Sequence, residues 1–135
     1  MHNAEYCVSD QTYKGILNDH SKANYYSNTF VSENAQKTEG YQLSKGILLS
    51  DKCSFFSKPE LRIFADDVKC SHGSTIGPVD ESALFYLRSR GISKNEAMKM
   101  IISSFIEEDL QSLDKNIAKL VSNNLSDYLK SLEDD

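Results

Sequence analysis

Short apolar and aromatic segments recur along the first 77 residues, and polar groups such as Asn18–His20 and Ser32–Asn34 separate them. The segment centres are spaced by roughly 14 to 18 residues, which is typical of strands that stack as the rungs of a β-helix. Strand length alone does not fix the topology, so a β-sandwich is the alternative. The expected strands are Tyr13–Leu17, Ala23–Val31, Gly40–Leu43, Ile47–Leu49, Ser54–Phe56 and Leu61–Phe64.

After this region the apolar spacing changes from the period of a strand to that of a helix. Asp80 is a suitable N-cap for a short helix. Ser93 and Glu96 form a capping-box sequence before a second helix, and the apolar spacing continues into a third. We therefore expect a mainly β core over residues 1–77 and a C-terminal helical domain over residues 78–135.

The composition excludes several classes of function. The net charge is −5, and nucleic acid is not the expected main partner because phosphate binding needs a basic surface. No apolar run approaches the roughly 20 residues of a membrane span. The three cysteines include no C-x-x-C pair, which predicts free thiols in a reducing compartment. No phosphate-binding loop, G-x-S-x-G, H-E-x-x-H or EF-hand sequence is present, so an independent enzyme is not expected.

A thiol and an imidazole alternate in the segment that ends in Cys70-Ser71-His72-Gly73. If this segment is one strand followed by a Gly/Pro loop, Asp66, Val68, Cys70 and His72 share one face. Thiols and imidazoles are the ligands of soft metals and iron–sulfur clusters. A single C-x-H triplet is weak support, and the alternative is a half-buried cysteine with a hydrogen-bonded histidine. One Cys and one His do not complete a four-ligand set, so no stable metal or cluster is expected in the isolated chain.

Longer motifs surround this triplet, and together they resemble SufD-type members of the SufB/SufD family, which are scaffold subunits of the Suf iron–sulfur cluster assembly system. The resemblance covers about residues 11–112 and implies the distal rungs of a right-handed parallel β-helix, followed by helices. Family members are much longer, so the chain is expected to be a C-terminal part with Met1 internal or added. The matching segments are Lys58-Pro59, Ala65–Gly73, Thr75–Gly77, Ala83–Ile92, Ala35–Thr38 and Leu48–Asp51.

The resemblance implies a non-catalytic scaffold that pairs with a SufB-like paralog and docks a SufC-like ABC ATPase. A nascent iron–sulfur cluster would form transiently at the interface with the paralog. His72 is the implied ligand, and Cys70 is either a second ligand or a small buried residue. Whether the complete complex carries a flavin is left open. The implied location is the bacterial cytoplasm, with a plastid-type organelle as the alternative.

The C-terminal helices are implied to contact the ATPase, although the same apolar residues could pack on one another. The residues expected at this contact are Phe85, Tyr86, Met98, Ile102 and Phe105. Two rival functions stay open. One is a metal-dependent enzyme that uses Cys70 and His72, and the other is a pure protein-interaction domain in which His72 is structural. Free strand edges also predict a homodimer of the isolated chain.

Overall fold

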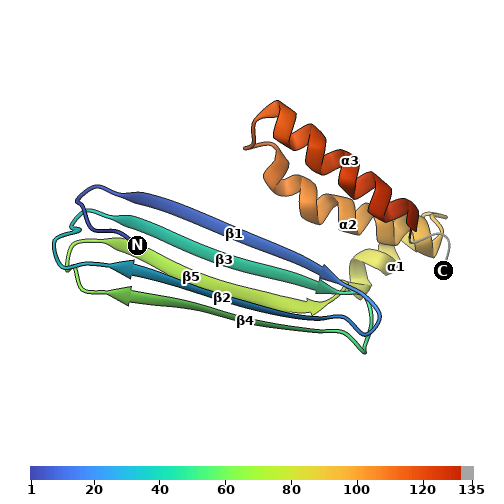
Figure 1. The fold of residues 1–135 in the computed structure, drawn as a ribbon. Coiled ribbons are helices and arrows are strands. Elements are labelled where there is room, and N and C mark those ends of the chain that lie inside the picture. The colour runs from blue at the N-terminus through green and yellow to red at the C-terminus, as the bar shows by residue number, and fades with distance from the viewer. Residues whose placement is uncertain (132–135) are drawn as a thin grey trace. The chain divides into compact units, whose positions relative to one another are not determined.

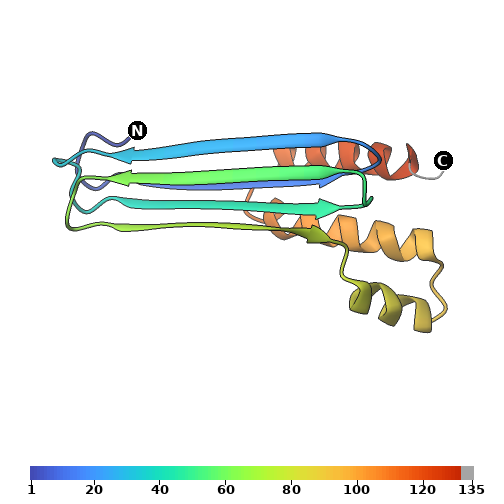
Figure 2. The ribbon, with the colours of Figure 1, turned by 90° about the horizontal axis from the view of Figure 1, so that it is seen from below.

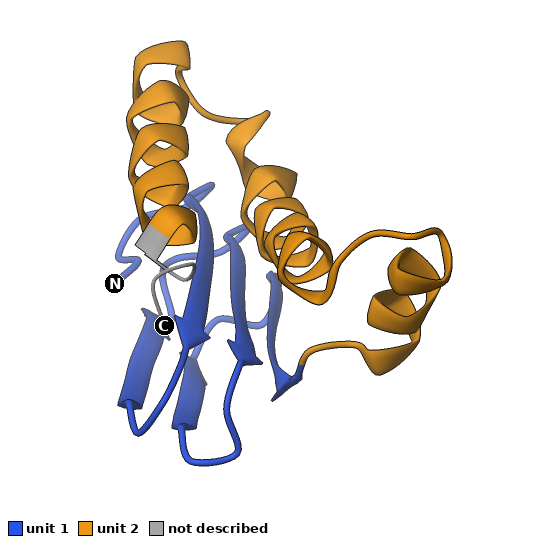
Figure 3. Ribbon diagram, turned by 90° about the vertical axis from the view of Figure 1, so that its right-hand side faces the viewer, with its two compact units in different colours: residues 1–78 blue, residues 79–135 orange. Residues whose placement is uncertain are grey.

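The computed structural model describes residues 1–131 and shows parallel strands followed by three helices, as predicted. Two compact units divide the chain, Met1–Pro78 and a second unit that begins at Val79 (Figure 3). The strands are β1 (Val8–Leu17), β2 (Lys22–Val31), β3 (Glu39–Leu48), β4 (Ser54–Ile63) and β5 (Lys69–Pro78). The helices are α1 (Glu81–Ser89), α2 (Lys94–Leu110) and α3 (Lys115–Ser131).

The strands alternate between two parallel sheets (Figure 1). One sheet has the order β1-β3-β5 and the other pairs β2 with β4. Figure 2 shows that the strands of one sheet point opposite to those of the other. Pairing is continuous in each sheet: Val8 pairs with Glu39, Glu39 with Lys69, and Lys22 with Ser54. The spacing seen in the sequence is therefore the step from one sheet to the other, and paired strands lie two steps apart.

Two pairs of predicted strands are each a single strand. Gly40–Leu43 and Ile47–Leu49 belong to β3 apart from Leu49, and Ser54–Phe56 and Leu61–Phe64 belong to β4 apart from Phe64. Polar residues in the middle of each strand hid the continuity, because backbone pairing rather than side-chain polarity keeps these segments extended. Pro59 is tolerated in β4 because, among the described residues, that strand pairs with β2 alone.

The predicted strand that ends at Gly73 is also wrong. Leu61–Ile63 completes β4, and a turn separates it from β5, which begins at Lys69 and continues to Pro78. Gly73 and Gly77 therefore lie inside a strand, paired with Leu43 and Ile47 of β3, and they do not form a loop. Pairing along the whole of β3 explains why two glycines are accommodated in this strand.

A pair of glycines makes room for an aromatic ring between the sheets. Gly15 of β1 and Gly46 of β3 lie in register, and the ring of Phe55 from β4 lies over both. A β-carbon added at Gly46 would lie 2.4 Å from Phe55 Cδ1, and one at Gly15 would lie 3.0 Å from Phe55 Cε1. Phe55 is buried with Leu17 and Cys53 in one of the core clusters. The absence of a side chain at these two positions thus permits this packing.

The helical unit begins at the predicted caps. The side chain of Asp80 accepts hydrogen bonds from the Ser82 and Ala83 amides, at 2.8 and 3.2 Å, and Ser93 accepts one from the Glu96 amide at 3.2 Å. Helix α1 packs against α2, and α2 packs against α3. Among the described residues, no helix has both the length and the apolar character that crossing a membrane requires.

Candidate functional site

Strand β5 carries Cys70 and His72 near its beginning, on the face that points toward the second sheet. In the parallel pairing with β3, Cys70 lies beside Gly40 and His72 beside Gln42. A β-carbon built on Gly40 would lie 3.3 Å from the Cys70 sulfur, so the sulfur lies close above that glycine. Cys70 also packs against a buried cluster that contains Val31. The thiol is therefore half-buried and held in place by apolar contacts.

His72 is exposed although it shares the face of Cys70. Within residues 1–131, β5 pairs with β3 alone, so its other edge is open, and no described side chain hydrogen-bonds to the imidazole. The prediction that Asp66 shares this face is wrong, because Asp66 lies in the turn before β5, where side chains do not alternate as they do in a strand. The imidazole is thus available at the end of a sheet.

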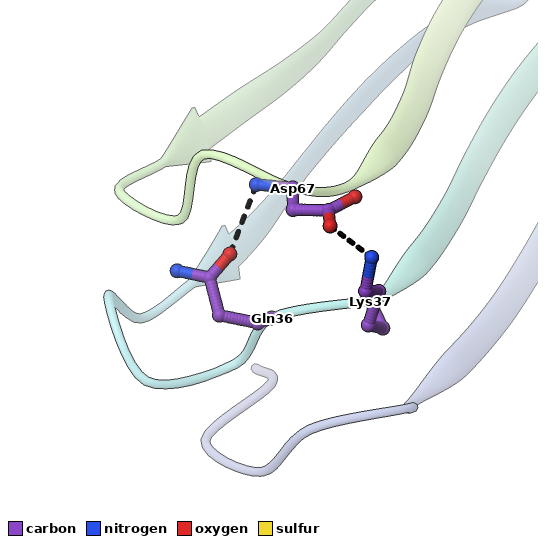
Figure 4. A network of polar contacts seen from close by, with 3 residues as sticks. All are labelled: Gln36, Lys37 and Asp67. Carbon is purple, nitrogen blue, oxygen red and sulfur yellow. Dashed lines mark hydrogen bonds and ion pairs between the residues drawn. The ribbon is translucent and has the colours of Figure 1, made fainter.

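The turn before β5 is tied to the equivalent turn before β3 (Figure 4). The Asp67 amide donates a hydrogen bond to Gln36 Oε1 at 2.9 Å, and the Lys37 amide donates one to the Asp67 carbonyl at 2.6 Å. Lys37 Nζ also forms an ion pair with the Asp67 carboxylate, and the resulting hydrogen bond raises the pKa of Lys37. These contacts fix where β5 begins, and so they set the position of the Cys70–His72 pair.

One residue further along, an ion pair joins the first residues of β3 and β5. Lys69 Nζ lies 2.9 Å from Glu39 Oε1. The hydrogen bond to Glu39 raises the pKa of Lys69, and the same bond lowers the pKa of Glu39. Both side chains are substantially exposed, so the pair contributes little stability but favours the observed register.

The described residues include no group of three or more His, Cys, Asp or Glu side chains that could hold a metal ion. Cys70 and His72 alone supply two ligands, whereas zinc sites and iron–sulfur clusters need about four protein ligands. The expectation that the isolated chain holds no stable metal stays a prediction. Chemically, the pair is a partial ligand set that a second molecule would have to complete.

The residues expected at an ATPase contact differ in exposure. Phe85 and Tyr86 on α1 are 75% and 57% exposed. The guanidinium of Arg90 lies over the Tyr86 ring, 5.2 Å from its centroid. On α2, Met98 and Phe105 are partly buried and Ile102 is fully buried. Within this set, the side chains that α1 contributes are therefore the most accessible to a partner.

The other two cysteines lie apart from this pair. The thiol of Cys53 is buried and donates to the Ser50 carbonyl at 3.0 Å, and Cys7 is partly buried. All three cysteines are free, as predicted from their spacing.

Sequence reasoning missed two polar residues that lie buried between the sheets. Gln42 and Thr29 are 4% and 3% exposed, and Gln42 Nε2 donates to Thr29 Oγ1 at 2.6 Å. The available signal was the alternation Gly40-x-Gln42-x-Ser44, which places three small or polar residues on one face of an apolar segment. Gln42 is the register neighbour of His72, so this hydrogen bond lies directly beside the candidate site.

Comparison with known proteins relates this geometry to a family. The family model described as "SUF system FeS cluster assembly, SufBD core domain" matches residues 1–105. The iron-sulfur cluster assembly protein SufD of Escherichia coli (strain K12) is 41% identical over 112 residues, which cover 83% of this chain and 26% of that protein. An iron-sulfur cluster assembly SufBD family protein of Synechocystis is 37% identical over 82% of this chain and 24% of its own length.

A plant protein named "Protein ABCI7, chloroplastic", from Arabidopsis thaliana, is 40% identical over 77% of this chain and 22% of its own length. The chain thus spans about a quarter of the length of these curated relatives. The family match includes all five strands and most of α2, and the strand that carries Cys70 and His72 lies inside it. The chain belongs to the SufBD core family of the SUF iron–sulfur cluster assembly system.

Proposed function

We propose that this chain is the part of a SufD-type scaffold subunit that meets a SufB-like paralog along β5. The observation that carries the proposal is the placement of His72, an exposed imidazole on the end strand of a sheet, beside a backbone edge that no strand of the described part of the chain pairs with. Such an edge is suited to contact with another protein chain. The half-buried Cys70 lies two residues away on the same face, so the paralog would find both candidate ligands together.

The fold of this scaffold is, in our proposal, the distal part of a right-handed parallel β-helix. The alternation of parallel strands between two sheets, in continuous register, supports this. In such a coil each pair of strands stacks on the preceding pair, and the last strand leaves one edge open. The open edge at β5 is then a consequence of the architecture.

The nascent cluster is the cargo of this interface. A neutral imidazole and a thiolate can each bind iron. Since the chain offers two such groups, the paralog supplies the remaining ligands and the cluster is shared and transient. The chain itself performs no catalysis, and ATP hydrolysis takes place in the ATPase partner. The location is the bacterial cytoplasm or a plastid; the relatives include a bacterial and a chloroplastic protein.

A SufC-like ATPase would dock on the helical unit. Phe and Tyr are enriched in the buried centre of protein interfaces, and Tyr also among the residues that dominate binding energy; Phe85 and Tyr86 are exposed side chains of these types. The double variant Phe85→Ala with Tyr86→Ala is expected to lose ATPase binding while it still binds the paralog. Co-purification of the three subunits measures both contacts. Normal ATPase recovery with this variant would show that the contact lies elsewhere.

The ligand role is tested with His72→Ala in the complete subunit, with His20→Ala as the matched control. His20 is also an exposed histidine, but it lies in the turn between β1 and β2. We expect His72→Ala to abolish or sharply reduce iron–sulfur cluster assembly in cells, and His20→Ala to leave it unchanged. Circular dichroism and thermal unfolding should show both variants folded. A folded His72→Ala protein with normal assembly would exclude the ligand role.

A further inference from the structure

The side-chain amide of Gln42 has one end satisfied and one end without a partner. Its Nε2 donates to Thr29 Oγ1, and both residues are almost fully buried. Its Oε1 is also buried, and no donor among residues 1–131 reaches it. A buried acceptor without a partner is costly, and native proteins satisfy nearly all of them. We therefore expect a nearby side chain to move within hydrogen-bonding distance of Gln42 Oε1 and donate to it.

Two register neighbours of Gln42 could supply this donor, and the buried Ser44 hydroxyl, two residues along β3 on the same face, is a third candidate without a partner among the described residues. Gln42 lies in register between Gln11 of β1 and His72 of β5, and all three point to the same face. Neighbouring strands are about 4.8 Å apart, so either side chain can reach the amide. Gln11 and His72 are both exposed. Glutamine is among the side chains that lose the most rotamer freedom when ordered, which favours the histidine.

We propose that Gln42 is a positioning residue for His72. Gln42 Oε1 accepts a hydrogen bond from one ring N–H of His72, while Thr29 holds the other end of the amide. An amide oxygen can only accept, so the ring nitrogen next to it must carry the proton. The neutral imidazole then keeps the lone pair of its other nitrogen for a metal. Partners of this kind fix the tautomer and orientation of metal-binding histidines.

The surroundings of the ring leave few competing groups. On the inward face, β3 presents Gly40, Gln42 and Ser44 beside this part of β5, and none of them titrates. From the second sheet, β4 turns Ser57, Pro59 and Leu61 to this side. On β5 itself, Cys70 is the titratable neighbour on the same face. Ser44 Oγ is also buried without a partner among the described residues, but it lies in register with Ser74, whereas the amide oxygen of Gln42 belongs to the residue in register with His72.

The test is a nitrogen-15 NMR measurement of the His72 ring in the full chain, at a pH where the imidazole is neutral. We expect one tautomer to dominate in the unaltered chain. Gln42→Met keeps the approximate side-chain volume but removes the acceptor, and it should shift the tautomer ratio by about fivefold, as expected for the loss of one hydrogen bond. Gln42→Glu retains an oxygen acceptor and should restore the preference. Gln11→Met is the matched control and should have no effect.

An unchanged tautomer ratio in folded Gln42→Met would overturn the proposal. A shift in Gln11→Met of the same size as in Gln42→Met would also overturn it, because the tautomer would then respond to a change that leaves the Gln42 acceptor in place. The inference rests on the proposed function in that His72 is taken as a cluster ligand. The positioning role of Gln42 and the ligand role of His72 can fail separately. If Gln42→Met shifts the tautomer ratio as expected but His72→Ala leaves cluster assembly unaffected, only the ligand role is rejected.

Discussion

Strands β3 and β5 are neighbours in continuous register, yet their inward faces differ in burial. This face is buried along β3, whereas on β5 it is only partly covered and leaves His72 and Ser74 exposed. β3 has a paired strand on both sides, whereas β5 has one on a single side within the described residues. The difference shows that the exposure of His72 follows from the place of its strand in the sheet, since its side chain points the same way as buried Gln42. The inward residues of β3 are Gly40, Gln42, Ser44 and Gly46, and their partners on β5 are Cys70, His72, Ser74 and Ile76.

Replacement of glycines tests the comparison most severely. Gly46→Ala in β3 places a methyl group 2.4 Å from the buried ring of Phe55, and overpacking of this kind typically costs about 3 kcal/mol of unfolding free energy. Gly77→Ala in β5 is the control, because nothing lies within 4 Å of its β-carbon position. Urea unfolding of both variants measures the difference. Gly77 lies on the outward face, so equal losses would mean that the cost comes from replacing a strand glycine and not from the contact with Phe55.

A smaller difference in the free energy of unfolding is expected between variants of Gln42 and His72, which are paired in register. Gln42→Ala removes a buried hydrogen bond and buried side-chain volume, and it should cost about 2 kcal/mol. His72→Ala removes an exposed side chain and, with it, the single hydrogen bond proposed to Gln42 Oε1, so it should cost only about 1 kcal/mol. The measurement is again the free energy of unfolding. A large loss from His72→Ala would contradict the open position assigned to this residue, and it would favour a structural role.

Removing the ion pair between Glu39 and Lys69 should have the smallest effect on stability. The pKa of Glu39 is held below its ordinary value of 4.5, so its contribution is present above pH 4.5 and is lost as the pH falls through the lowered pKa. The pKa of Lys69 is raised above 10.5, so its contribution is lost only as the pH rises past that value. Lys69→Met should therefore unfold at a slightly lower temperature near pH 7.

The difference between the Lys69→Met variant and the unaltered chain should disappear in acid, where Glu39 is protonated in both. It should also shrink at high salt, because the pair is exposed and screened. Thermal unfolding scans between pH 3 and pH 8 measure this. A difference that grows toward low pH would show that Lys69 stabilises the strand through something other than Glu39.

The element types could be predicted from the sequence because they depend on local patterns. Apolar spacing indicated strands and helices, and the Asp80 and Ser93 caps are hydrogen bonds between residues two or three apart. Strand boundaries were not predictable in the same way. β5 runs through two glycines because it pairs with β3, and that support comes from residues distant in the sequence.

In the candidate site, too, the features that depend on local sequence could be predicted and those that depend on strand pairing could not. The alternation of Cys70 and His72 on one face follows from strand geometry and could be stated from the sequence. The assignment of Asp66 to that face failed because a turn intervenes, and nothing in the local pattern indicated where the strand begins. Gln42 could not be assigned to the site at all, since its position beside His72 depends on the register of two strands.

The most direct test of the proposed scaffold role is hydrogen exchange of the complete subunit, alone and bound to the SufB-like paralog. If β5 is the interface, amides in residues 69–77 should become strongly protected in the complex. Amides of β3, already paired on both sides, should change little. Protection that appears elsewhere while β5 exchanges as fast as in the free subunit would contradict the assignment of this strand, and of His72, to the cluster interface.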